Sequence, residues 1–219
     1  NTFYMSKSAG VDPTTGEQLY WAYEKNADGS MKPGSEYVTN DATVAASCKY
    51  LQGSRIPDIY GSISSSLKFR GFDLGLLFTY SLGGKIYNYS EIYMAGSQFA
   101  NQYRYMLNAW HPVRNPNSDI PRAGAKSDAA LPSDFMIHDA SYLRLKNITL
   151  SYTFDLKKKC SWMKDLTLSV SGENLFLWKK YNGFDPDVSS EGTSSTLRRM
   201  DLGAYPKPRT IIFSLQLRY

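Results

Sequence analysis

Apolar and polar residues alternate along the end of the chain, from Thr210 to Tyr219. The residues of one parity are apolar or aromatic: Ile211, Phe213, Leu215, Leu217 and Tyr219. The other parity is polar except at Ile212. A period of two places these sets on opposite faces of an extended strand. A strand that crosses a bilayer needs about 9–11 residues, with an apolar outer face and aromatics at the interface. We therefore expect the final strand of a transmembrane β-barrel.

The same period appears earlier in the chain. Apolar and polar residues alternate from Gly61 to Leu82 on both sides of Arg70-Gly71, and this pattern predicts a hairpin with a very short turn. Apolar and polar residues also alternate from Tyr142 to Phe154, but the phase slips near Lys146-Asn147, which indicates either a β-bulge or a rim segment that leaves the lipid. Leu166 to Glu173 supplies the returning strand. The polar parity of these strands is rich in Ser, Gly and charge, which suits the wet interior of a barrel better than a sandwich core.

The connections between these strands alternate in length. Arg70-Gly71 and the region around Lys157 to Cys160 are short, whereas Gly83 to Ser141 and Trp178 to Pro208 are long. Transmembrane barrels of the outer membrane have short periplasmic turns and long extracellular loops. This arrangement predicts a periplasmic C-terminus.

The signals outside these strands are weaker. Phe3 to Ser8 and Gln18 to Tyr23 could each be a strand, and Asn26 to Gly53 is polar and irregular. Glu91 to Trp110 is compatible with a short helix. The total is about seven strands, whereas closed bacterial barrels have even counts of about eight or more. We therefore expect the chain to be the C-terminal part of a longer polypeptide that supplies the other strands.

Composition narrows the choice of class. The 219 residues are 42 % hydrophobic and contain no apolar run long enough for a transmembrane helix. The 17 tyrosines suit aromatic girdles or ligand-binding loops. The net charge of +5 is modest, and the basic run Lys157 to Lys159 is interpreted as a solvated turn, so no nucleic-acid partner is expected. Cys48 and Cys160 have no metal-site spacing, and we expect unpaired thiols.

Several motifs resemble one family when taken in order. They are Gly10-Val-Asp-Pro-Thr-Thr-Gly16, Pro57-Asp-Ile-Tyr-Gly61, Gly83-Gly-Lys-Ile-Tyr87, the segment Ala140 to Tyr152, Ser171-Gly-Glu-Asn-Leu-Phe176 and the segment Tyr205 to Tyr219. Together they resemble the C-terminal end of SusC/RagA-type TonB-dependent outer-membrane transporters, and the match covers nearly all of residues 1–219.

The resemblance implies an all-β, antiparallel barrel of about 22 strands that is closed by a plug domain. It also implies import of oligosaccharides or peptides across the outer membrane of a Gram-negative bacterium. The partners implied are the plug and earlier strands of the same transporter, a SusD-like surface lipoprotein, the TonB complex and outer-membrane lipids. No cofactor is implied. No plug domain or TonB box is recognisable in this sequence.

Three sets of residues are candidates for function. Substrate contacts are expected from aromatic and cationic side chains in the two long loops: Tyr103, Arg104, Tyr105, Trp110, His111, Trp178, Tyr181, Phe184, Arg198 and Arg199. Packing within the loops, or contact with the lipoprotein, is the alternative for each. Ionisable groups on the polar parity are expected to line the lumen: Lys68, Arg70, Asp73 and Glu173. The apolar end resembles an assembly signal for outer-membrane insertion: Phe213, Leu215, Leu217 and Tyr219.

The sequence does not favour an enzyme or a metal-binding protein. His111 and His138 lack a Ser or Cys partner at a catalytic spacing, and no two acids are predicted to pair. Asp185 and Asp187 could supply oxygen ligands to calcium, but a Pro-rich turn explains the pattern, and no metal is expected. Two other classes stay open, a glycan-binding β-sandwich and a passive porin or adhesin barrel. A sandwich would bury Phe69, Phe78, Phe154 and Phe213 against a second sheet, whereas a barrel would expose them to lipid.

Overall fold

The computed structural model describes residues 2–95, 101–124, 131–156, 162–188 and 199–219. The chain divides into two compact units, and each is described by itself. The first, the loop unit, comprises Asn1–Ile56, Lys85–His138 and Val188–Ala204. The second, the sheet unit, comprises Pro57–Gly84, Asp139–Asp187 and Tyr205–Tyr219. Among the described residues, no helix has the length and apolarity needed to cross a membrane.

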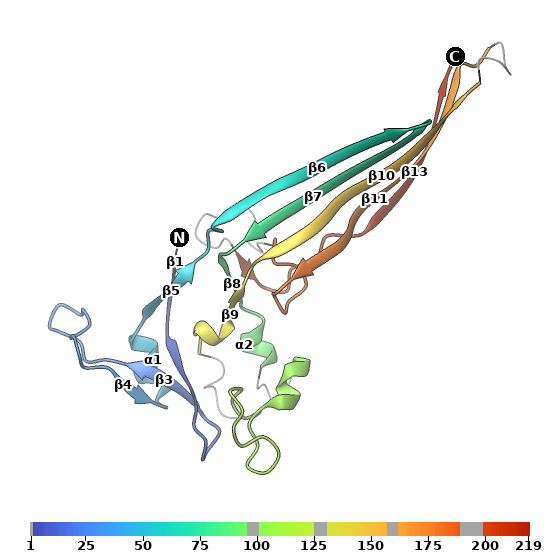
Figure 1. The fold of residues 1–219 in the computed structure, drawn as a ribbon. Coiled ribbons are helices and arrows are strands. Elements are labelled where there is room, and N and C mark those ends of the chain that lie inside the picture. The colour runs from blue at the N-terminus through green and yellow to red at the C-terminus, as the bar shows by residue number, and fades with distance from the viewer. Residues whose placement is uncertain (1, 96–100, 125–130, 157–161, 189–198) are drawn as a thin grey trace. The chain divides into compact units, whose positions relative to one another are not determined.

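The sheet unit is built from five long antiparallel strands that lie side by side in Figure 1. They are β6 (Ile59–Phe69), β7 (Phe72–Leu82), β10 (Tyr142–Asp155), β11 (Asp165–Lys179) and β13 (Thr210–Arg218). Their order in the sheet is β13-β11-β10-β7-β6. The predicted hairpins and final strand are therefore confirmed. The predicted turn around Lys157 to Cys160 lies outside the described residues.

The turn between β6 and β7 explains the short connection. Arg70 has a φ of 46° and Gly71 a φ of 88°. Two consecutive positive φ values define a type I′ turn, whose twist matches that of the flanking strands. This turn fixes the register of the hairpin, in which Phe69 is paired with Phe72 and Leu67 with Leu74.

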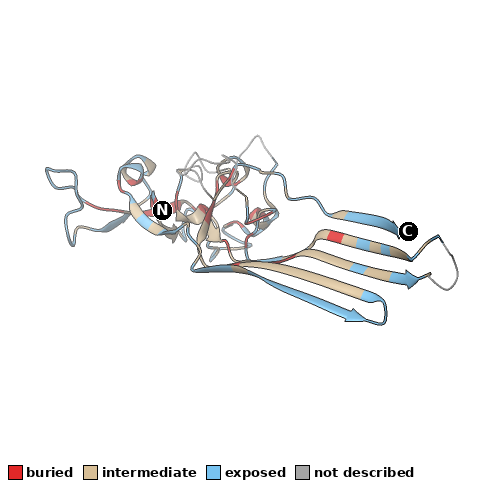
Figure 2. Cartoon of the chain, turned by 90° about the horizontal axis from the view of Figure 1, so that it is seen from above, coloured by how far each residue is buried: buried red, intermediate tan, exposed pale blue. Residues whose placement is uncertain are grey.

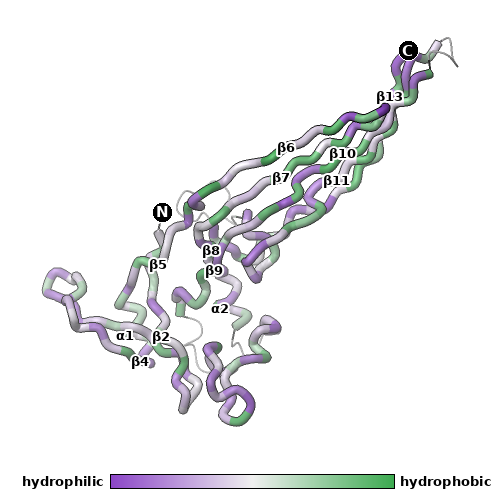
Figure 3. The backbone as a smooth tube through the Cα atoms, viewed as in Figure 1, coloured by the Kyte–Doolittle hydropathy of each residue, from purple (hydrophilic) through white to green (hydrophobic). Residues whose placement is uncertain are grey.

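Apolar side chains form continuous rows across one face of the sheet. One row follows the register from β6 to β13: Leu67, Leu74, Leu150, Val170 and Phe213. The next row contains Phe69, Phe72, Tyr152, Leu168 and Leu215. Figure 3 shows the same alternation along each long strand. These rows are exposed: Leu150 is 44 % accessible and Phe213 is 80 % accessible. Figure 2 accordingly shows the strands as exposed or intermediate, with few buried positions.

The opposite face of the sheet is polar. One row contains Ser66, Gly75, Thr149, Ser171 and, as an apolar exception, Ile212; the next contains Lys68, Asp73, Ser151, Ser169 and Ser214. In the described part of the sheet unit, the exposed apolar rows have no second sheet packed on them. The predicted two-faced strands are thus confirmed, and the arrangement differs from the sandwich alternative.

The predicted bulge is also confirmed. The register of β10 shifts between Leu145 and Asn147 against both β7 and β11. Because one residue is inserted, Leu145 and Leu143 return to the apolar face, where they pair with Phe78 and Tyr80. The apolar band therefore continues past the bulge to the loop end of the sheet.

The loop unit contains short strands in small sheets. The strands are β1 (Thr2–Met5), β2 (Lys7–Val11), β3 (Gln18–Ala22), β4 (Tyr37–Thr39), β5 (Tyr50–Ser54), β8 (Lys85–Asn88), β9 (Ile137–Asp139) and β12 (Met200–Asp201). They pair as β1-β5, β2-β3-β4 and β12-β8-β9. The described residues thus contain strands β1 to β13, so the estimate of about seven was too low. The strands expected at Phe3 to Ser8 and Gln18 to Tyr23 are present as β1, β2 and β3.

Two expectations for this unit are wrong. Asn26 to Gly53, expected to be irregular, contains β4, most of β5 and helix α1 (Ala42–Ser47), which the Asp41 carboxylate caps. The single helix expected over Glu91 to Trp110 is replaced, in its described part, by two short pieces, α2 (Glu91–Met94) and the 3₁₀ helix η1 (Arg104–Asn108). Helices this short depend on packing, because propensity alone does not hold them.

Packing in the loop unit is divided among small cores. One contains Phe3, Tyr87 and Met136, the last from the 3₁₀ helix η3 (Asp134–Met136). Another contains Ala22, Tyr23 and Cys48, where the free Cys48 thiol is buried and donates to the carbonyl of Tyr23. Cys160 lies outside the described residues, so its pairing stays open.

Candidate functional site

Polar side chains on the second face of the sheet satisfy one another laterally. The hydroxyl groups of Thr149 and Ser171 lie 2.9 Å apart, as do those of Thr153 and Thr167. Lys68 Nζ lies 3.1 Å from Asp73 Oδ2 across the β6–β7 hairpin. In the described part of the sheet, this face therefore forms a hydrophilic wall of hydroxyl groups and two cross-strand ion pairs, Lys68–Asp73 and Arg218–Asp165.

The predicted lumen residues have distinct positions on this wall. Lys68 and Asp73 lie in one polar row, and Glu173 on β11 pairs with Asn147 on the same face. Arg70 lies in the hairpin turn, where its guanidinium group stands 5.2 Å from the centre of the Phe69 ring. Their contact with a lumen stays a prediction.

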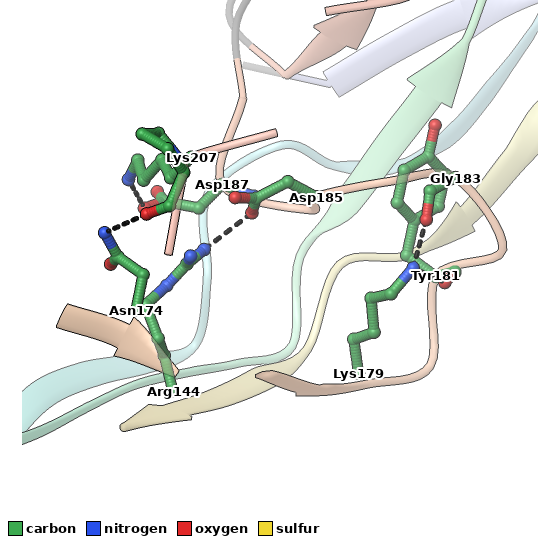
Figure 4. Close-up of polar contacts among 9 residues, drawn as sticks. Arg144, Asn174, Lys179, Tyr181, Gly183, Asp185, Asp187 and Lys207 are labelled. Atoms are coloured by element: carbon green, nitrogen blue, oxygen red, sulfur yellow. Dashed lines mark hydrogen bonds and ion pairs between the residues drawn. The ribbon is translucent and has the colours of Figure 1, made fainter. Parts of the chain in front are cut away.

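A buried ion pair marks the loop end of the polar face. Arg144 Nη2 on β10 lies 2.6 Å from Asp185 Oδ1, and the two side chains are 4 % and 1 % exposed (Figure 4). Arg144 also stands over the ring of Tyr142, at 5.4 Å. No sequence pattern links these two residues. An arginine on the polar parity beside the bulge was the available signal, but nothing in the sequence names its partner.

The calcium hypothesis does not fit this geometry. Asp185 is engaged by Arg144, and Asp187 Oδ2 lies 2.5 Å from Lys207 Nζ. Each of the two carboxylates is therefore paired with a cationic side chain of the protein. Among the described residues, no cluster of three or more His, Cys, Asp or Glu side chains could hold a metal ion.

The candidates from the last loop are dispersed. Trp178 was placed in the loop, and this is wrong: it lies in β11, paired with Leu143 on the apolar face and stacked on Phe176. Tyr181 is buried, whereas Phe184 is 69 % exposed. Arg199 belongs to the loop unit, where its carbonyl accepts from the Tyr87 amide. Arg198 lies outside the described residues.

Tyr103 and Tyr105 are brought together by η1. Their rings stack, with centroids 5.6 Å apart and planes 13° apart. Asn88 donates to the Tyr103 hydroxyl over 3.5 Å. Burial, and then the nearby Glu91 carboxylate, raise the pKa of Tyr105, and burial raises the pKa of Tyr103. Both phenols therefore stay neutral and keep a proton to donate.

The two histidines have structural partners. His138 Nε2 lies 2.9 Å from Oε2 of Glu91, whose side chain is 1 % exposed. His111 Nδ1 accepts from the amides of Val113 and Arg114, which closes a turn. These contacts give each histidine a local role within the loop unit.

Trp110 packs on the first hairpin of the loop unit. Its indole N–H donates to the Pro13 carbonyl over 3.3 Å, and its ring lies against Gly16. Arg122 strengthens this junction, because its amide donates to the Gly16 carbonyl and its side chain pairs with Glu17 at 3.1 Å. Trp110 therefore packs within the loop unit, which is the alternative given for it above. Arg104 is exposed on η1.

This junction gives a first testable prediction. A Cβ at Gly16 would lie 2.2 Å from the Trp110 ring, and the residue has a φ of +73°. Gly16→Ala should therefore destabilise the junction by about 1–3 kcal/mol through overpacking, in addition to backbone strain. Hydrogen exchange of the full-length receptor should show faster exchange in both the hairpin and the Trp110 loop.

Gly29→Ala is the matched control. Gly29 has a similar φ of +82°, but nothing lies within 4 Å of the position of its Cβ. It carries the backbone strain without the clash. Equal exchange rates in the two variants would show that the Trp110 contact is not the determinant.

Known proteins resemble the chain in sequence and in fold. No family model matches the chain. It is 31 % identical over 201 residues to TonB-dependent receptor P3 of Formosa agariphila, an overlap that covers 87 % of this chain and 20 % of that protein. It is 26 % identical over 205 residues to TonB-dependent receptor SusC of Bacteroides thetaiotaomicron, covering 91 % of this chain and 19 % of that protein.

Solved structures agree. The chain matches the structure of the RagAB peptide transporter with a TM-score of 0.76 and 26 % identity, over 99 % of this chain and 23 % of that one. It matches the RagAB peptide importer in its open-open state with a TM-score of 0.77 and 25 % identity, over 22 % of that chain. The chain thus spans about a fifth of the length of the curated relatives and less than a quarter of these solved chains.

The class of protein follows from the fold together with these matches. A five-stranded antiparallel sheet with an exposed apolar face and a polar second face is a wall segment of a transmembrane β-barrel. Within that class, the chain belongs to the SusC/RagA-type TonB-dependent receptors, of which it is a segment.

Proposed function

We propose that this chain forms part of the barrel wall of an outer-membrane importer that takes up oligosaccharides or peptides together with a SusD-like surface lipoprotein. The observation that carries the proposal is the two-faced sheet, whose apolar rows suit lipid and whose hydroxyl-rich rows suit a hydrated passage. The match to the RagAB peptide transporter supports it. The plug and the remaining strands belong to the rest of the receptor.

The dimensions of the apolar face support this role. From Phe72 to Tyr80, β7 rises about 27 Å at about 3.4 Å per residue. The apolar band of an outer-membrane barrel is about 25 Å tall, with aromatic girdles at both edges. Aromatics stand at both ends of the band: Phe69, Phe72, Tyr152 and Phe154 near the hairpin turn, and Tyr80, Phe176 and Trp178 at the loop end.

The orientation follows from the same barrel geometry. The hairpin turn at Arg70-Gly71 and the C-terminal end of β13 lie at the same end of the antiparallel sheet. Short turns of outer-membrane barrels face the periplasm. We therefore place Tyr219 on the periplasmic side and the opposite ends of β7, β10 and β11 on the extracellular side.

Uptake by cells tests the function directly. The full-length receptor and a SusD-like surface lipoprotein are expressed together, and cells are given fluorescent maltooligosaccharides or fluorescent oligopeptides. If the cells take up one of these two substrate classes, and this uptake stops when the proton gradient is dissipated, the result supports an importer. Uptake that persists without the gradient would instead favour the passive porin.

The aromatic C-terminus gives a second prediction, about assembly. Tyr219→Asp should reduce insertion of the full-length receptor severalfold, because it removes the terminal aromatic from the apolar parity and puts a charge there. Tyr205→Asp is the control, since Tyr205 is 91 % exposed and lies before β13, whereas Tyr219 is 87 % exposed at its end. The folded, heat-modifiable fraction in outer membranes is measured on gels. Equal fractions for the two variants would remove Tyr219 from the assembly signal.

A further inference from the structure

The segment from Tyr181 to Asp187, here called the shelf, is held on the polar face of the sheet. Two cationic side chains at the loop end of that face bind it. Arg144 pairs in register with Thr79 and Leu177. The adjacent row, Tyr80, Leu143 and Trp178, lies on the apolar face, so Arg144 projects from the polar face. Lys179 pairs with Tyr142 and has the same parity as Leu177. The shelf therefore lies over the hydrophilic wall.

The contacts that hold the shelf are numerous for so short a segment (Figure 4). Arg144 reaches Asp185 over 2.6 Å. Lys179 Nζ donates to the carbonyl of Tyr181 over 3.1 Å and to the carbonyl of Gly183. Asp185 Oδ1 also accepts from the Asp187 amide over 2.9 Å, which closes a turn. At the far end, Asp187 pairs with Lys207.

Burial along the shelf is uneven. Tyr181, Asp185 and Pro186 are buried, with exposures of 2 %, 1 % and less than 2 %. Gly183 permits this packing, because a Cβ there would lie 2.3 Å from the Tyr181 ring. Phe184, between these anchors, is 69 % exposed. A turn anchored by charged side chains thus leaves one apolar ring exposed.

We infer that the shelf is a constriction at the extracellular end of the passage and that Phe184 is the side chain it presents to passing cargo. This inference rests on the proposed function, since the polar face borders a passage only if the sheet is part of a barrel wall. Phe184 then provides a flat apolar surface on a rigid support, and the Arg144–Asp185 pair positions it. Arg144 itself is occupied by Asp185 and does not bind cargo.

Cysteine labelling of the full-length receptor in outer membranes tests this position. Phe184→Cys is treated with a small sulfonated maleimide or with a maleimide on a long polyethylene glycol chain. A cysteine inside a narrowed passage is expected to react with the small reagent but not with the large one. Reaction with both reagents would place Phe184 on the outer crown, and reaction with neither would bury it. Either result overturns the inference.

Two reference variants calibrate the assay and separate the inference from the proposed function. Val113→Cys, 83 % exposed in the loop unit, defines labelling by both reagents, and Leu150→Cys on the apolar face should react with neither. Labelling of Leu150→Cys would refute the barrel wall itself. Adding Arg144→Ala to Phe184→Cys should restore reaction with the large reagent. An unchanged pattern in that double variant would show that the ion pair does not hold the shelf.

Discussion

Breaking the buried ion pair by Arg144→Leu is expected to lower the free energy of unfolding by about 3–5 kcal/mol. The reason is that Asp185, 1 % exposed, would keep a buried carboxylate without its cation. The guanidinium group donates to Asp185 Oδ1, and the Asp187 amide donates to the same oxygen. Urea unfolding of the full-length receptor refolded into lipid vesicles measures this loss.

The double variant Arg144→Leu/Asp185→Leu is the matched control. It removes both charges, so the penalty of a lone buried charge disappears, and its cost should be smaller than that of Arg144→Leu alone. If the double variant is instead as unstable as the sum of the two single variants, the side chains act independently. The Arg144–Asp185 contact would then not hold the loop end of the sheet together.

Leu150→Arg is expected to destabilise the folded receptor by about 2–4 kcal/mol, as a cation does near the bilayer midplane on the lipid face of a barrel. Leu150 lies in a central apolar row between Leu74 and Val170 and is 44 % exposed. The same unfolding measurement in vesicles reports the change.

Two further substitutions test whether depth and face determine the cost. Leu215→Arg should cost only about 0–1 kcal/mol, because Leu215 shares its row with Phe72 and Tyr152 near the membrane interface. Ser151→Arg should also be mild, because it places the cation on the polar face, beside Asp73 in register. A penalty for Ser151→Arg equal to that of Leu150→Arg would mean that both faces of the sheet meet lipid.

The strands and their turn could be predicted because their signals are local. Alternation with period two is a property of neighbouring residues, and the Arg70-Gly71 turn needs only two residues that accept positive φ. The bulge was visible for the same reason, since Leu143 and Leu145 change parity relative to Ile148. These features survive in the structure at the positions where the pattern places them.

The end of β11 was missed because its apolar parity is interrupted by residues that are not apolar. Asn147 pairs with Glu173 and Leu145 with Phe176, so two residues of β11, Asn174 and Leu175, stand opposite the single Lys146 of β10. Gly172 and Asn174 occupy the apolar parity of β11, so no apolar side chain continues the alternation between Val170 and Phe176. The pattern therefore ended at Glu173, and Trp178 was assigned to a loop although it lies on the apolar face.

Contacts between distant segments could not be predicted. Trp110 is held by Gly16 and Pro13, and Arg144 by Asp185, and each pair is far apart in sequence. An aromatic or cationic side chain in a loop has the same appearance in sequence whether it packs, pairs or faces a ligand. Its role depends on which backbone and which charge the fold brings beside it.

The sequence by itself determined that the long strands have one apolar and one polar face, where their shortest turn lies and where β10 bulges, because each depends on the order of adjacent side chains. Only the tertiary structure decided that the Tyr181 to Asp187 segment folds onto the polar face, that Trp110 supports a hairpin and that Phe184 stays exposed. Burial and ion pairing between remote residues decide such matters, because the free energy of those contacts exists only once the strands are assembled.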